Sequence, residues 1–152
     1  MTPIRLAGAA ATEALGERLA PLLRPGDAVA LFGALGAGKT TLARGVLRGL
    51  GHRGDVASPT FPIVQVYEPP QTRIPLWHVD LYRIEDPSEL DELGIDDARA
   101  ETALLIEWPE RLPHLWPDAL RLTLTADSAD ARILTAEVPP AWGIRFQTLD
   151  WR

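Results

Sequence analysis

The stretch LFGALGAGKTT, Leu31–Thr41, decides the fold of this chain, because a short apolar run breaks there into glycines followed by lysine. Its residues match the spacing G-x-x-x-x-G-K-[ST], which begins at Gly33 and ends at Thr40. The pattern leaves an unbroken apolar run, Ala28–Phe32, which is typical of a strand buried on both faces. It then enters a segment with helical spacing of apolar residues. This context predicts a phosphate-binding loop, or P-loop.

Each residue type in the loop has a physical task in holding phosphate. Gly33, Gly36 and Gly38 let the backbone adopt conformations that a Cβ would forbid, so that its N–H groups converge on a phosphate. The start of the following helix adds its dipole and free N–H groups. We expect Lys39 to bridge β- and γ-phosphate oxygens and the Thr40 hydroxyl to ligate Mg²⁺. The predicted nucleotide contacts in the loop are Gly33, Ala34, Leu35, Gly36, Ala37, Gly38, Lys39, Thr40 and Thr41.

A magnesium-dependent P-loop also needs a carboxylate, and two residues are candidates. Glu107 ends the apolar run Ala103–Ile106, and Asp80 lies inside another apolar strand. The position of Glu107 at a strand end is typical of Walker-B acids, and burial of Asp80 would be costly without a cation or a hydrogen-bond partner. A solvated strand face for Asp80 and a surface charge for Glu107 stay open as the plainer interpretations. His78 lies two residues before Asp80 on the same strand face and could orient it, although a lone strand histidine is more often structural.

The rest of the chain shows strand and helix patterns on both sides of the loop. We expect a strand at Ile4–Leu6 and a helix near Thr12–Leu23, with Thr12 as its N-cap. A β-hairpin is predicted by the runs IVQVYE and IPLWHVDLY, a short helix by DPSELDELG, and two antiparallel strands by RLTLT and RILTAEV. The prediction is an α/β fold: a single P-loop NTPase domain, residues 1–152, with a mixed, mainly parallel central sheet flanked by helices.

Composition and charge limit the classes of function. The net charge of -6 argues against a free-standing nucleic-acid binder, which relies on Lys and Arg to neutralise phosphates. The absence of cysteine excludes disulfides, thiolate metal sites and a cysteine nucleophile. We see neither a secretory signal nor an apolar run of about 18 residues that would argue for a membrane helix. We therefore expect a cytoplasmic protein without a membrane partner.

Known classes of P-loop protein can be tested against the sequence. A GTPase would carry N/T-K-x-D, which is impossible because Lys39 is the only lysine. The L-S-G-G-Q signature of transporter-type ATPases does not occur. A small metabolite kinase usually has an arginine-rich lid; the only dense arginines here follow the loop helix, so this class is weak but open. ATP is favoured as the nucleotide only by default.

Five motifs occur in a characteristic order: GALGAGKTTLARG, SPTF, HVDLYR, ELDELGI and IEWPER. In order and spacing the chain resembles the bacterial TsaE family, the ATPase that takes part in making threonylcarbamoyladenosine in tRNA. The resemblance covers about Leu31–Arg111. It implies a P-loop α/β domain that binds ATP with Mg²⁺ and hydrolyses it slowly without partners. It also implies assembly with the TsaB and TsaD proteins, and contact with tRNA only indirectly through that complex.

The resemblance implies roles for single residues as well. Thr40 and Glu107 look like the magnesium-side ligands, and Asp80 like a catalytic carboxylate that places the attacking water. Thr60, in SPTF, would sense the nucleotide, and Trp108 would contact the site. The expected catalytic residues are Asp80, Lys39 and Glu107.

Some questions stay open on the sequence alone. Arg83 is the one arginine in the chain that we would name as a candidate to stabilise γ-phosphate charge, and it is not a clear one. The tail from about Pro113 onward matches no motif. The alternative functions are a small P-loop metabolite kinase and a nucleotide-gated binding protein in which hydrolysis is incidental.

Overall fold

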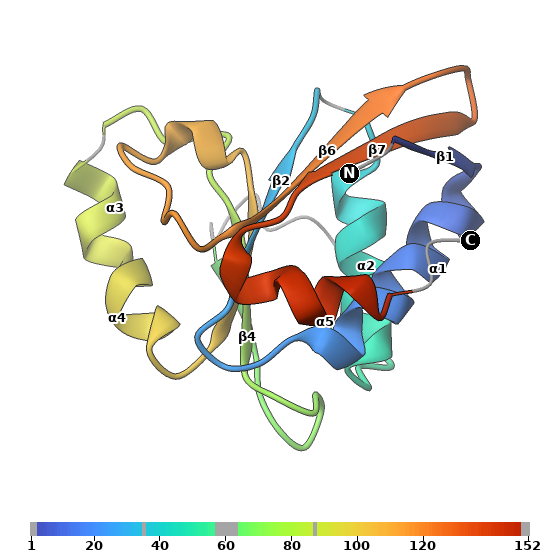
Figure 1. The fold of residues 1–152 in the computed structure, drawn as a ribbon. Helices are drawn as coiled ribbons and strands as arrows, with labels where there is room; N and C mark the ends of the chain where they lie inside the picture. The colour runs from blue at the N-terminus through green and yellow to red at the C-terminus, as the bar shows by residue number, and fades with distance from the viewer. Residues whose placement is uncertain (1–2, 35, 57–63, 87, 150–152) are drawn as a thin grey trace.

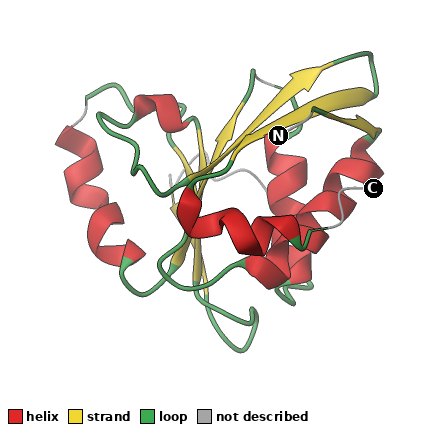
Figure 2. Cartoon of the chain, in the orientation of Figure 1, coloured by secondary structure: helices red, strands yellow, loops and turns green. Residues whose placement is uncertain are grey.

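The computed structural model describes residues 3–34, 36–56, 64–86 and 88–149, which contain a seven-stranded mixed sheet (Figure 1, Figure 2). The strand order is β1-β7-β6-β2-β5-β4-β3. The four central strands β6, β2, β5 and β4 are parallel, and antiparallel strands flank them at both edges. The strands are β1 (Ile4–Ala7), β2 (Ala28–Phe32), β3 (Val64–Tyr67), β4 (Leu76–Asp80), β5 (Ala103–Glu107), β6 (Leu120–Ala126) and β7 (Ala131–Glu137). The predicted fold class is confirmed.

Helices cover both faces of the sheet. In Figure 1, α1 and α2 lie together on one side, and α3 and α4 lie on the other. The helices are α1 (Ala9–Leu19), α2 (Lys39–Gly49), α3 (Ser88–Leu93), α4 (Ile95–Arg99) and α5 (Gly143–Gln147). No helix in these described ranges is long and apolar enough to cross a membrane.

The central strands are buried on both faces, as their unbroken apolar runs predict. In β5, Leu105 packs into the core under α1 and α2, whereas Leu104 and Ile106 pack into the core under α3 and α4. Successive side chains of a strand point to opposite faces, so an all-apolar strand serves two cores at once. Burial on both faces fixes the register of β5 and hence the position of Glu107 at its carboxyl end.

Close packing against α1 fixes the position of α2, the helix that follows the glycine loop. A Cβ added to Gly45 would lie 2.0 Å from the carbonyl oxygen of Glu13, and one added to Gly16 would lie 2.4 Å from that of Leu42. A real Cβ atom would not fit at such distances, so the backbones of α1 and α2 are in contact at these two glycines. The pair therefore holds the first turn of α2 firmly against α1.

The predicted bounds of the first helix are wrong. The helix α1 begins at Ala9 and ends at Leu19, and its N-cap is Gly8 at φ 98° rather than Thr12. Thr12 lies in the first turn, and its hydroxyl donates to the carbonyl of Gly8 at 3.4 Å. Glycine adopts this positive φ without strain, which allows the chain to turn directly from β1 into α1. The other patterns are confirmed: the hairpin β3–β4, the helix α3 and the antiparallel pair β6–β7.

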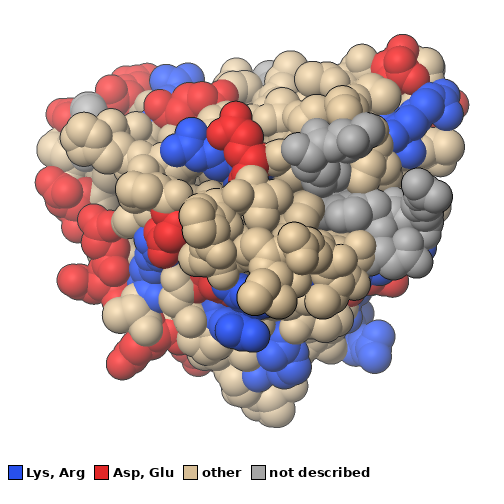
Figure 3. Space-filling model, in the orientation of Figure 1, with Lys and Arg blue, Asp and Glu red and all other residues tan. Residues whose placement is uncertain are grey.

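Acidic side chains gather on one side of the molecule. Residues 85–101, which include α3 and α4, contain eight Asp or Glu and one Arg. Figure 3 shows acidic side chains along the edge of the molecule where Figure 1 places these two helices. A surface of this sign repels the phosphates of nucleic acid.

Candidate active site

The loop between β2 and α2 has the backbone that the glycine spacing predicts. Gly33, Gly36 and Gly38 have φ values of 147°, 76° and 106°, all outside the range that other residues readily adopt. Within the same loop, the N–H of Ala37 donates to the carbonyl of Ala34 at 3.1 Å. The loop leads into α2 at Lys39, as expected. The prediction for Leu35 falls outside the described residues.

Lys39 reaches back across the loop. Its Nζ donates to the carbonyl oxygen of Gly33 at 2.6 Å and lies 3.6 Å from the centre of the Trp108 ring. The residue is only 4% exposed, and burial lowers its pKa, while the nearby charges of Glu107 and Glu110 oppose the shift. The single lysine of the chain thus has its ammonium group at the mouth of the glycine loop.

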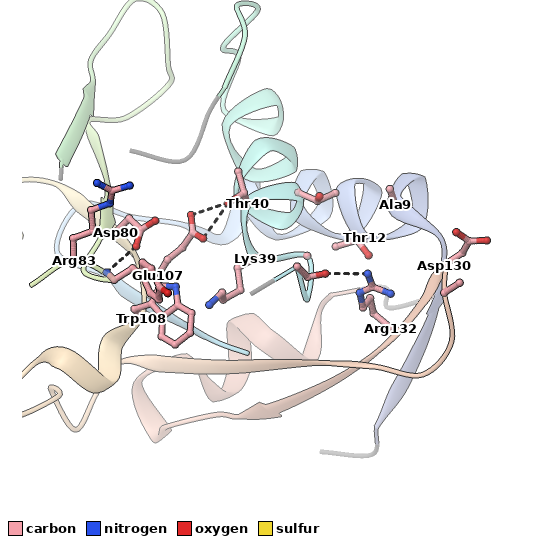
Figure 4. A pocket seen from close by; sticks show the side chains of 15 residues that line it. Ala9, Thr12, Lys39, Thr40, Asp80, Arg83, Glu107, Trp108, Asp130 and Arg132 are labelled. Atoms are coloured by element: carbon pink, nitrogen blue, oxygen red, sulfur yellow. Dashed lines mark hydrogen bonds between the residues drawn. The ribbon is translucent and has the colours of Figure 1, made fainter. Parts of the chain in front are cut away.

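Glu107 and Thr40 meet at the start of α2. The Thr40 hydroxyl oxygen lies 3.1 Å from Glu107 Oε1 and 3.3 Å from Oε2 (Figure 4). Glu107 is 2% exposed, so the interpretation of a plain surface charge is wrong. Hydroxyl and carboxylate oxygens are the ligand types that Mg²⁺ takes, so this pair fits the magnesium-side role.

His78 contacts Glu107, not Asp80 as the shared strand face suggested. Its Nε2 lies 2.6 Å from Glu107 Oε2, and the ring is fully buried. The parallel register pairs His78 with Leu105 and Asp80 with Glu107. The contact therefore runs diagonally between neighbouring strands, which a single strand's alternation cannot predict.

Asp80 ends β4 directly beside the end of β5. It is 7% exposed, and its Oδ1 accepts the backbone N–H of Tyr82 at 3.0 Å. A solvated strand face is therefore the wrong interpretation for this residue. Because β4 and β5 are parallel neighbours, their terminal acids come together at the same edge of the sheet as the glycine loop.

Trp108 follows Glu107 in an unusual backbone conformation. Its φ is 58°, a left-handed value that is an outlier for a bulky residue. Such strain costs on the order of 1–3 kcal/mol and is characteristic of functional sites. The conformation places the ring against Lys39 and 4.9 Å from the ring of Tyr82.

These residues surround one cavity of about 500 Å³ (Figure 4). Its acid side carries Asp80, Tyr82, Arg83, Glu107 and Trp108, and its floor carries residues of the loop and of α2. The loop and α2 residues that line it are Gly36, Gly38, Lys39, Thr40 and Thr41. Thr60 lies outside the described residues, as does the rest of SPTF. No cluster of three or more His, Asp or Glu that could by itself hold a metal occurs in the described part of the chain.

The opposite side of the cavity comes from segments without a recognised motif. Ala9 and Thr12 of α1 line it, together with Ala129, Asp130 and Arg132 at the β6–β7 turn. The Arg132 guanidinium donates from Nε to the carbonyl of Ala37 and from Nη2 to that of Gly36, both at 3.0 Å. Sequence reasoning missed Arg132; the alternating pattern of its strand predicted the hairpin but not this contact.

Comparisons with known proteins place the chain in a family. The family model "Threonylcarbamoyl adenosine biosynthesis protein TsaE" matches residues 6–134. A TsaE protein of Streptomyces coelicolor is 46% identical over 121 residues, which cover 76% of this chain and 82% of that protein. The TsaE protein of Bacillus subtilis is 36% identical over 140 residues, covering 91% and 84%. The crystal structure of Bacillus subtilis YdiB superposes with a TM-score of 0.75 at 27% identity, covering 96% of this chain and 91% of that one. The chain therefore belongs to the TsaE family of tRNA threonylcarbamoyladenosine biosynthesis proteins.

Proposed function

We propose that this chain is a Mg²⁺-dependent ATPase that supports the cycle of the TsaB–TsaD transferase during threonylcarbamoyladenosine synthesis. One observation carries the proposal: Lys39, Thr40, Glu107 and Asp80 line a single cavity beside a glycine loop of positive φ. Hydrolysis of ATP needs a cation that binds the phosphates, ligands for Mg²⁺ and a carboxylate beside the attacking water, and these four residues would supply them.

Lys39 would bind the phosphates. Its ammonium now donates to the Gly33 carbonyl, a neutral acceptor, and phosphate oxygens would be stronger acceptors for the same donor. The low exposure of Lys39 favours the exchange, because a partly desolvated cation gains more from an anion than a hydrated one.

Thr40 and Glu107 would hold Mg²⁺ between them and the phosphates. Bound there, Mg²⁺ would neutralise charge that develops on the phosphate oxygens. Asp80, one strand away, would accept a proton from the attacking water or fix its direction. The far end of the cavity, between α1 and the β6–β7 turn, would take the nucleoside.

The charges around the cavity and on the surface support a need for partner proteins. Arg83 is the only arginine on the acid side of the cavity in the described part of the chain, and it is exposed. An arginine supplied by a partner is worth about 10³–10⁵ in rate in other P-loop enzymes, so we expect the isolated chain to turn over slowly. The acidic surface of residues 85–101 supports contact with tRNA only through the partners. The proposal requires the cytoplasm, where tRNA and ATP are both present.

The test is ATP hydrolysis by the purified chain, alone and with the TsaB–TsaD pair. We expect slow turnover alone, activation by the pair, and loss of both in Glu107→Ala. Glu137→Ala is the matched control, because that glutamate lies at the exposed end of β7 and its loss leaves the cavity intact. No response to the pair would contradict the proposal, and a rate that needs an added small acceptor would favour the kinase alternative.

A further inference from the structure

His78 is fully buried, and its ring contacts the carboxylate of Glu107, a residue that lines the cavity. Nε2 lies 2.6 Å from Glu107 Oε2, and Nδ1 has no hydrogen-bond partner among the residues that the structure describes. An ionised carboxylate can only accept, so the Nε2 atom carries the proton and donates it. The other ring nitrogen, Nδ1, is then buried without a polar partner in the described residues.

Stability does not explain a histidine at this position. A buried polar atom without a partner costs folding free energy, and an apolar side chain of similar size would avoid that cost. The ring lies in the middle of β4, where Val79 follows it in the strand and Leu105 is its partner in β5. The contact with Glu107 is what distinguishes the histidine from such a residue.

Glu107 is held from two sides. The Thr40 hydroxyl, on helix α2, lies 3.1 Å from Oε1 and 3.3 Å from Oε2, and the His78 ring, on strand β4, contacts Oε2. We propose that His78 is a positioning residue: by occupying Oε2 it fixes the rotation of the Glu107 carboxylate and leaves Oε1, the oxygen nearer to Thr40, available to Mg²⁺. This inference rests on the proposed function, because it assigns Glu107 to the magnesium side.

The expected effect is on magnesium affinity. Hydrogen-bond partners that orient a ligating carboxylate are typically worth about 10–100-fold in metal affinity. Without His78, Glu107 would remain at the strand end and keep its contact with Thr40, but its carboxylate would lose the hydrogen bond that fixes its rotation. Magnesium binding would then weaken, while contacts between the loop backbone and the phosphates would persist.

The experiment measures binding of fluorescent mant-ADP to the full-length chain, titrated with Mg²⁺ and separately in EDTA. His78→Asn and His78→Gln form the decisive pair, because the glutamine amide N–H reaches close to the Nε2 position and the asparagine amide reaches only to Nδ1. We expect the Mg²⁺ midpoint to rise about 10–100-fold in His78→Asn and to stay within about threefold in His78→Gln. Affinity in EDTA should change in neither variant.

His52→Leu is the control, since this histidine also has a buried unpartnered Nε2 but packs on the ring of Tyr67, not on an acid. Equal Mg²⁺ midpoints for His78→Asn and the unaltered chain, or equal losses in both His78 variants, would overturn the positioning role alone. A Mg²⁺ effect missing from the unaltered chain would overturn the proposed function as well.

A second measurement needs no magnesium and no variant. The chain has three histidines, so a long-range ¹H–¹⁵N spectrum of the ligand-free protein resolves each ring. The expected pattern for His78 includes a proton on Nε2. A proton on Nδ1 alone would remove the donor to Glu107 and overturn the inference.

Discussion

The two sides of the cavity act on the glycine loop in different ways. On the acid side, Asp80 and Glu107 stand at the carboxyl ends of two parallel strands and present charge toward the start of α2. On the hairpin side, Arg132 forms no ion pair with an acid in the described part of the chain and instead donates to two loop carbonyls. One side supplies the charges that chemistry on a phosphate needs, and the other supplies the shape of the loop.

The hairpin side controls the direction of backbone N–H groups. In a trans peptide the C=O and N–H point in opposite directions. When Arg132 binds the carbonyl of Ala37, it therefore also fixes the N–H of Gly38, the residue before Lys39. The comparison indicates that charge substitutions on the acid side will change rates, whereas changes on the hairpin side will change nucleotide affinity or stability.

The largest expected effect comes from Asp80→Asn on the acid side. General-base groups contribute about 10²–10⁴-fold to a rate, so we expect ATP hydrolysis with the TsaB–TsaD pair to fall by that factor. Nucleotide affinity, measured by mant-ATP binding, should change by no more than a few-fold. Full hydrolysis in this variant would deny Asp80 its role. Hydrolysis lost with cellular function kept would favour the nucleotide-gated binding protein.

A change at the junction of loop and hairpin should act on stability instead. A Cβ on Gly33 would lie 2.6 Å from the carbonyl oxygen of Leu124 in β6, at a φ that alanine also disfavours. Overpacking of this kind costs about 1–3 kcal/mol, so Gly33→Ala should lower the free energy of unfolding in urea by at least that amount. Gly143→Ala, where a Cβ meets no atom within 4 Å, should stay within about 0.5 kcal/mol. Equal stability of the two variants would contradict the close approach.

The smallest effect is expected for Arg132→Ala. Loss of two charged hydrogen bonds to the loop should weaken ADP binding about tenfold, or about 1.4 kcal/mol, by calorimetry. The rate at saturating ATP should hardly move, because the acid side is untouched. Arg121→Ala on the same hairpin is the control: its ion pair with Glu137 spans 3.9 Å at the surface. A large loss of rate in Arg132→Ala would contradict the assignment of rate to the acid side and of nucleotide affinity to the hairpin side.

The sequence by itself determined the parts of the site that depend on neighbours in the chain. Gly33, Gly38, Lys39 and Thr40 act through local backbone geometry, so their spacing is enough to predict the loop and the helix after it. The apolar run Ala103–Ile106 likewise predicted a buried strand with an acid at its end. Local patterns failed where glycine altered an element boundary, as at Gly8 before α1.

Only the tertiary structure decided which of these side chains meet. His78 contacts Glu107 across 29 positions of sequence, Thr40 contacts the same acid across 67, and Arg132 reaches the loop across 95 and 96. These contacts depend on strand order and register, which follow from burying two cores on opposite faces of one sheet. That requirement is a property of the whole fold, and no single segment of sequence carries it.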